Sequence, residues 1–199
     1  MEEHFWNCIK RGDEQAFNSL YEQYADMLYG YGMKIIADEE LVGNAIQSLF
    51  VYLYEKRKTI SEPNSVSAYL CVSLKRLISL EVKKRRDSRN VSIEDVSYPD
   101  YDFELEIDIE KTMIAAECDK ELLNSLQQAL DTLTKRQREI VYLKYFKEMN
   151  NNEIATIMDL SIQTVKNTNT QALARLREFQ KLANTYIVLS VFLLSLLLF

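Results

Sequence analysis

The sequence has few residues that interrupt helices: 4 Gly and 2 Pro among 199 residues. Long helices are therefore easier to accommodate than many tight turns. The chain also lacks any stretch of alternating apolar and polar residues, which is the pattern of a half-buried strand. These absences predict an all-α fold, and the length leaves room for one domain or two small ones.

Residues for metal or nucleophilic chemistry are scarce as well. His4 is the only histidine, so the sequence excludes a His-based metal site and a Ser-His pair beyond the N-terminus. The three cysteines, Cys8, Cys71 and Cys118, are far apart and odd in number, which suits a reducing cytosol and argues against a disulfide framework. With no convergent set of acid, base and nucleophile, the sequence predicts no enzyme, no cofactor and no metal. The acidic first residues predict no signal peptide.

The net charge of −6 is unevenly distributed along the chain. Residues 1–90 carry 13 basic and 13 acidic groups, and residues 119–182 carry 10 basic and 8 acidic groups. Residues 91–118 carry one lysine against nine carboxylates. The acidity therefore belongs to one middle segment and does not argue against DNA binding by its flanks.

Regular helical spacing marks residues 5–88, the first predicted domain. Apolar residues recur every three or four positions from Phe17 to Ile35 and again from Leu41 to Leu53, which predicts amphipathic helices. A further helix ends in the most basic stretch of the chain, so we expect three or four helices here. Residues 89–117 lack such spacing and form a predicted acidic linker. This linker is either a solvated tether or an acidic strand that imitates a nucleic-acid backbone.

The second predicted domain, residues 118–182, contains signals for helix starts. Thr134 and Gln137 have the spacing of a capping box, which predicts a helix from about Lys135. Beyond it, Asn151 or Asn152 can cap a short helix.

A turn and a second helix follow the short helix. Asp159 tolerates the left-handed conformation of a turn, and Ser161 can cap the helix that begins there. This order predicts a helix-turn-helix, whose second helix enters the DNA major groove. The predicted DNA-contacting residues of this helix are Gln163, Thr164, Lys166, Asn167, Thr170, Gln171 and Arg175. Amide side chains can pair with adenine and Lys with phosphate, although the same residues could merely solvate an exposed face.

Three segments together resemble the sigma-70 family of bacterial RNA polymerase sigma factors, in the extracytoplasmic-function (ECF) subfamily. Residues 12–54, GDEQAFNSLYEQYADMLYGYGMKIIADEELVGNAIQSLFVYLY, resemble the start of region 2. AYLCVSLKRLISLEVKKRR resembles the promoter-melting helix that follows. LDTLTKRQREIVYLKYFKEMNNNEIATIMDLSIQTVKNTNTQALARLRE resembles region 4, with the pattern EIA…S…TVK…A…LR.

The resemblance implies roles for each segment. Region 2 would bind the polymerase clamp and engage the −10 element, region 4 would recognise the −35 element, and the linker would run towards the RNA-exit region. The implied polymerase-binding residues are Leu41, Asn44, Gln47, Ser48, Phe50 and Tyr54. The implied −10 residues are Lys75, Arg76, Lys83, Lys84, Arg85 and Arg86.

Some residues depart from the family pattern. Asn44 and Ser48 stand where acidic residues usually face the basic clamp, so we expect a weaker contact there. Asn169 stands where an apolar residue is usual, and a buried Asn must find partners or cost roughly 1–3 kcal/mol.

The chain ends in an uncharged apolar segment, Tyr186–Phe199, within the predicted tail 183–199. Its 14 residues are fewer than the roughly 20 that a membrane-spanning helix needs. Three interpretations stay open: a helix packing on region 4 or on a partner, a membrane-surface or tail anchor, and a signal for degradation or aggregation.

The sequence therefore predicts a cytoplasmic sigma factor with membrane association through the tail left open. Its expected partners are core RNA polymerase through the clamp and flap regions, promoter DNA, and an anti-sigma factor. The alternative is a stand-alone helix-turn-helix regulator, with or without a membrane tether.

Overall fold

The computed structural model describes residues 2–86, 101, 103–105 and 117–183. Side chains are described for residues 6–85, 101, 103–105 and 124–179. The chain divides into two compact units, one of Met1–Asp102 with Thr156–Met158 and one of Phe103–Ala155 with Asp159–Phe199. The described residues form helices and turns without a strand, which confirms the predicted all-α fold.

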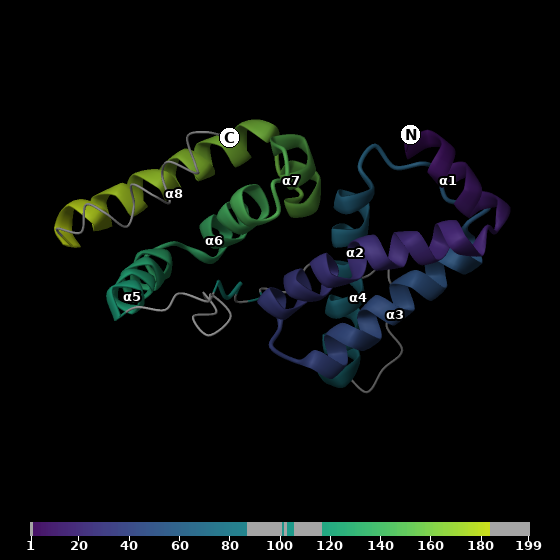
Figure 1. Ribbon diagram of the computed structural model, residues 1–199, viewed down its shortest axis with the longest axis horizontal. Coiled ribbons are helices and arrows are strands. Elements are labelled where there is room, and N and C mark those ends of the chain that lie inside the picture. The colour runs from purple at the N-terminus through teal and green to yellow at the C-terminus, as the bar shows by residue number, and fades with distance from the viewer. Residues whose placement is uncertain (1, 87–100, 102, 106–116, 184–199) are drawn as a thin grey trace. The chain divides into compact units, whose positions relative to one another are not determined.

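The described residues of the first unit form four helices: α1 (Glu2–Arg11), α2 (Glu14–Ile35), α3 (Glu39–Lys56) and α4 (Val66–Arg86). Helices α2, α3 and α4 pack against one another, and α1 packs on α2 (Figure 1).

Two aspartates fix where α2 and α3 begin. The carboxylate of Asp13 accepts hydrogen bonds from the first backbone N–H groups of α2, and that of Asp38 accepts from the N–H of Leu41 in α3. A side-chain oxygen at this position satisfies amide groups that have no partner within the helix.

The core of the first unit forms where α2, α3 and α4 meet. Much of the predicted stripes is buried there, including Leu20 and Leu28 of α2 and Leu49 of α3. At Gly32 a Cβ atom would lie 2.7 Å from Cγ1 of Val42, so only glycine allows α2 and α3 to approach this closely. The burial of these apolar faces is the main stabilising contribution to such a bundle.

The described part of the second unit contains α5 (Glu117–Asp131), α6 (Lys135–Val141), the π-helical turn η2 (Tyr142–Phe146), α7 (Asn151–Met158) up to Ala155, and α8 (Ile162–Ala183) (Figure 1). The predicted capping box is confirmed at α6. The amide of Gln137 donates to Oγ1 of Thr134, and the side chain of Gln137 accepts from the backbone N–H of Thr134.

The prediction that Asn151 or Asn152 caps α7 is wrong. The cap is Asn150, whose Oδ1 accepts from the N–H groups of Asn152 and Glu153 at 2.9 and 3.1 Å. The carboxylate of Glu153 accepts in return from the N–H of Asn150 at 2.8 Å. The reciprocal bonds make this a capping box, and Glu153 selects Asn150 because it lies three residues later.

Two residues of the predicted linker are buried in the second unit. The ring of Phe103 packs on that of Tyr142, with centroids 5.5 Å apart, and the Nε2 of Gln127 donates to the carbonyl of Leu105 at 3.1 Å. Phe103 and Leu105 have almost no exposed surface. The interpretation of the segment as a solvated tether is therefore wrong at these two residues, because their apolar side chains are buried in the second unit.

Within the described parts of the chain, no helix combines the length and apolar character needed to cross a bilayer. The predicted tail 183–199 lies outside the described residues except for Ala183, and so does most of the predicted linker.

Candidate functional site

The segment from α7 to α8 has the backbone of a helix-turn-helix. Asp159 ends α7 in the left-handed conformation, with φ 52°, as the sequence predicts. The N–H of Leu160 donates to the carbonyl of Ala155 at 2.9 Å, which closes the turn. Ser161 then caps α8, because its hydroxyl accepts from the N–H of Thr164 at 3.0 Å. The chain is thus redirected within three residues, and α8 starts from a fixed position.

One face of α8 holds it in the second unit. Val165, Ala172 and Leu176 are completely buried. Asn169 lies on this seam and donates from Nδ2 to the hydroxyl of Tyr145 at 3.0 Å, while its buried Oδ1 has no hydrogen-bond partner among the described residues. The expected need of this asparagine for a partner is therefore met at one of its two polar atoms.

The opposite face of α8 is exposed, and we call it the recognition face. Its exposed residues are Gln163, Lys166, Asn167, Thr170 and Gln171. Thr164, also predicted to contact DNA, is half-buried, and its hydroxyl lies 2.7 Å from that of Ser161. The structure thus brings the predicted amide and hydroxyl groups together on one side of the helix.

Two side chains on the recognition face are already hydrogen-bonded to each other. The Nε2 of Gln163 donates to Oδ1 of Asn167 at 2.8 Å. These residues are one helical turn apart, at the spacing where side chains on a helix meet. Sequence analysis placed both residues on this face but did not identify the pair.

Arg175 has a different environment from the other predicted DNA-contacting residues. Its guanidinium donates to Oε1 of Gln137 at 3.1 Å and to the carbonyl of Thr132 at 3.5 Å. Arg175 therefore ties α8 to the capped start of α6. The prediction that it also contacts DNA stays a prediction.

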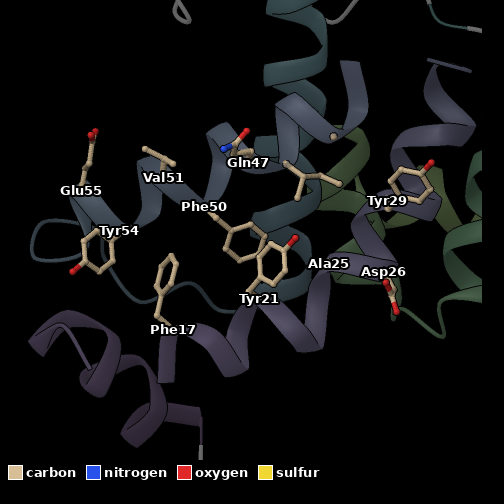
Figure 2. Close-up of a pocket in the computed structure, with 12 residues that line it drawn as sticks. Phe17, Tyr21, Ala25, Asp26, Tyr29, Gln47, Phe50, Val51, Tyr54 and Glu55 are labelled. Carbon is tan, nitrogen blue, oxygen red and sulfur yellow. The ribbon is translucent and has the colours of Figure 1, made fainter. Parts of the chain in front are cut away.

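A groove of about 750 Å³ lies between α2 and α3 in the first unit (Figure 2). Phe17 and Tyr21 come from α2, and Phe50 and Tyr54 come from α3. Their rings contact edge to face, with centroids 4.9 Å apart for Tyr21 and Phe50 and 5.4 Å apart for Phe17 and Tyr54. We call this the aromatic groove. Its other lining residues are Ala25, Asp26, Tyr29, Gly43, Ile46, Gln47, Val51 and Glu55.

The implied polymerase-binding residues fall into three groups. Gln47, Phe50 and Tyr54 line the aromatic groove. Asn44 and Ser48 are exposed on α3 but do not line it. Leu41 is buried in the helical core, where it supports α3 and offers no surface to a partner.

Sequence analysis missed the contribution of α2 to this groove. Tyr21 and Val51 are about half exposed, at 47% and 51%, and Tyr29 is 40% exposed. The signal in the sequence was an apolar stripe on α2 with more aromatic residues than the core of a small bundle can enclose. Exposed aromatic surface of this kind marks interaction sites.

The basic residues of α4 differ in accessibility. Arg76 and Lys84 are exposed, and Lys84 pairs with Glu81 at 2.8 Å. Lys75 is only 5% exposed, with its ammonium 5.1 Å from the centroid of the Tyr101 ring. The resemblance implies that this lysine contacts the −10 element, but its side chain is buried.

Three implied −10 residues remain. Arg85 pairs with Asp38 at 2.6 Å, and Lys83 is half-buried. The side chain of Arg86 lies outside the described residues. The implied contacts of α4 with the −10 element stay predictions.

Asp38 connects the cap of α3 to the end of α4. The backbone N–H of Leu41, which donates to Oδ1 of Asp38, holds the pKa of this carboxyl below its ordinary value of 3.8, and Arg85 adds to the effect. The lowered pKa means that the folded protein stabilises the ionised form of this carboxyl.

Comparisons with known proteins support the interpretation of both units. Residues 123–176 match the family model described as Sigma-70, region 4. The ECF RNA polymerase sigma factor SigW of Bacillus subtilis is 22% identical over 159 residues, which cover 79% of this chain and 85% of SigW. The RNA polymerase sigma-E factor of Streptomyces coelicolor is 23% identical over 171 residues, covering 84% of this chain and 87% of that protein. Residues 123–176 thus match region 4 of the sigma-70 family, and most of the chain is similar to ECF sigma factors.

Solved structures share the fold of this chain. It is similar to CnrH in complex with the cytosolic domain of CnrY, with a TM-score of 0.54, 17% identity and coverage of 90% of this chain and 97% of that chain. It is also similar to the sigma factor RpoE in complex with the anti-sigma factor NepR from Bartonella quintana, with a TM-score of 0.53, 20% identity and coverage of 83% and 96%.

The region 4 match contains the helix-turn-helix and all the predicted −35 residues of this chain. The first unit lies outside that match, but the alignments to SigW and sigma-E extend over most of the chain. These similarities agree with the resemblance that the sequence motifs carried.

Proposed function

We propose that this chain is a sigma factor that directs core RNA polymerase to specific promoters for transcription initiation. The observation that carries this function is a capped helix-turn-helix with an exposed recognition face, in a chain of the sigma-70 family. A recognition helix of this kind presents its N-terminal residues to base edges in the major groove.

The proposed division of labour follows the predicted domains. Residues 5–88 bind polymerase and engage the −10 element, and residues 118–182 recognise the −35 element. The acidic segment 89–117 connects them. Support comes from the aromatic groove in the first unit and the recognition face in the second.

The polymerase contact is proposed to depend on apolar surface. Asn44 and Ser48 supply no charge to a basic clamp, whereas Tyr21, Val51 and Tyr54 expose apolar area beside them. Buried aromatic side chains are often the residues that contribute most to a protein interface. The groove therefore supplies affinity that the missing carboxylates do not.

The recognition helix carries too little positive charge for strong DNA binding alone. Lys166 is its only basic residue before Arg175. Each neutralised phosphate contributes about −0.9 to the slope of log K against log salt, so one lysine gives weak binding at physiological salt. This observation favours a polymerase-dependent factor over the alternative, a stand-alone helix-turn-helix regulator.

The remaining parts of the proposal follow from the family. The chain acts in the cytoplasm without catalysing a reaction, because the chemistry of RNA synthesis belongs to the polymerase. An anti-sigma factor is a proposed partner, since the similar RpoE was solved in complex with the anti-sigma factor NepR. Contact of Tyr186–Phe199 with a membrane or a protein stays open.

The test measures binding of the purified full chain to promoter DNA with and without core polymerase at physiological salt. A sigma factor should bind core polymerase and give specific DNA binding only in that complex. Tight, specific DNA binding by the chain alone, with no binding to core polymerase, would overturn the proposal and support the stand-alone regulator.

A further inference from the structure

A hydrogen bond joins Gln163 and Asn167, two polar side chains of the recognition face. The two amides are joined by the 2.8 Å hydrogen bond from Nε2 of Gln163 to Oδ1 of Asn167. Both residues are exposed and stand in the N-terminal half of α8, the part that a helix-turn-helix places against base edges. A pair that is ordered before binding loses less side-chain freedom when it meets DNA.

Neighbouring hydroxyl groups on this helix form hydrogen bonds within α8 and its cap. The hydroxyl of Thr164 bonds with that of Ser161 at 2.7 Å, and the hydroxyl of Thr170 donates to the carbonyl of Lys166 at 3.0 Å. The two threonine hydroxyls are thus engaged in local hydrogen bonds, whereas each amide of the pair keeps one polar atom that its mutual bond does not use.

The internal hydrogen bond determines what the pair can offer to a base. With Nε2 of Gln163 and Oδ1 of Asn167 engaged, the remaining amide atoms are an acceptor, Oε1 of Gln163, and a donor, Nδ2 of Asn167. Rotating both amide groups exchanges these atoms but again leaves one acceptor and one donor, so the pattern does not depend on the amide assignment.

This pattern complements one base. In the major groove adenine offers the N6 amino group as donor and N7 as acceptor. Guanine offers two acceptors, O6 and N7, and would place O6 against the acceptor of the pair. Guanine is usually contacted by Arg or Lys, and the N-terminal half of α8 has only Lys166.

We propose that Gln163 and Asn167 act as one unit that recognises a single adenine in the promoter, so that this sigma factor selects A over G at that position. The proposal rests on the proposed function, because it requires the recognition helix to lie in the major groove of a promoter. It adds the base class and the two residues that select it.

The test uses holoenzyme assembled from core polymerase and the full chain, with a promoter library randomised in the upstream element. Sequencing of the transcripts gives the base preference at each position. The wild type should prefer A over G at one position by roughly 5- to 150-fold, the range for a good two-bond contact with a base. Gln163→Ala and Asn167→Ala should each abolish most of that preference at the same position.

The double variant distinguishes a unit from two separate contacts. If the pair acts together, losing both residues should relax the preference no further than losing one. Gln128→Ala is the matched control, since it truncates an exposed amide on α5 outside the proposed interfaces and should leave the preference unchanged. Gln163→Glu gives a second test. The carboxylate would accept from Nδ2 of Asn167, so the pair would offer two acceptors to the base. The preference should then shift towards cytosine, whose N4 amino group is a donor.

The outcomes separate this proposal from the proposed function. The holoenzyme could transcribe from selected promoters and yet show no preference for A that these variants reduce. That result would overturn the proposal and leave the sigma function standing. Independent effects of the two single variants at two different positions would overturn it as well. Failure to initiate on any library member would refute the proposed function and this proposal with it.

Discussion

Replacing Phe103 by alanine tests the docking of the linker segment on the second unit. Phe103 is completely buried against Tyr142. A Phe→Ala change in a closed core costs about 3–5 kcal/mol, but residues 103–105 can leave the second unit without unfolding it. The loss in the free energy of unfolding is then limited to the contribution of the docked residues 103–105. Burial of the Phe103 ring and of Leu105 contributes about 2–3 kcal/mol.

The single tryptophan makes the two units distinguishable in the assay. Trp6 is the only tryptophan of the chain and lies buried in the first unit. Thermal unfolding followed by tryptophan fluorescence therefore reports the first unit, whereas far-ultraviolet circular dichroism reports both. Phe103→Ala should lower the midpoint of the second unit by roughly 10 °C and leave the fluorescence midpoint unchanged.

The control removes a phenylalanine that contributes little to the core. Phe146 is 44% exposed and stacks on the same Tyr142, with ring centroids 5.9 Å apart. Phe146→Ala should cost about 1 kcal/mol or less. Equal midpoints for the two variants, or no shift for Phe103→Ala, would refute the conclusion that the segment is docked.

Three further predictions follow from individual contacts. Because the pKa of Asp38 is lower in the folded protein than its ordinary 3.8, its stabilising contribution is complete above that pH and is lost as pH falls through the folded value. Asp38→Asn should therefore make tryptophan-detected stability less sensitive to acid. Tyr145→Phe removes the partner of the Asn169 amide and should cost about 1–3 kcal/mol in chemical denaturation, most of it recovered by adding Asn169→Leu. Tyr54→Ala in the aromatic groove should weaken core polymerase binding by about tenfold or more, whereas Tyr52→Ala, exposed on the same helix outside the groove, should change it by less than about threefold.

Each of these predictions has a contradicting result. Identical acid sensitivity in Asp38→Asn would show that the carboxylate does not stabilise the folded form. A Tyr145→Phe protein as stable as the wild type would show that the buried amide needs no partner. Equal losses for the two tyrosine variants would place the polymerase contact outside the aromatic groove.

Local signals predicted much of the second unit from the sequence alone. Thr134 with Gln137 marked the start of α6, and Asp159 and Ser161 marked the turn into α8. These features depend on residues that are close in sequence, so their chemistry is visible without the fold. The exposed residues of the recognition face followed from helical periodicity for the same reason.

Contacts between distant residues were beyond the reach of local patterns. Phe103 and Leu105 lie in an acidic segment, and their burial depends on a site built by α5 and the end of α6. Likewise the aromatic groove needs rings from both α2 and α3, and periodicity gives each helix only one apolar stripe. The burial of Lys75 could not be predicted for the same reason, because the sequence shows its charge but not which distant residues surround it.

The central claim is that this chain gives core RNA polymerase its choice of promoter. The most direct measurement is single-round transcription with core polymerase, the full chain and a library of genomic fragments, with the 5′ ends of the RNA mapped by sequencing. The account predicts new start sites that depend on the chain and share sequence elements at fixed distances upstream. The same start sites with and without the chain, across the whole library, would contradict it.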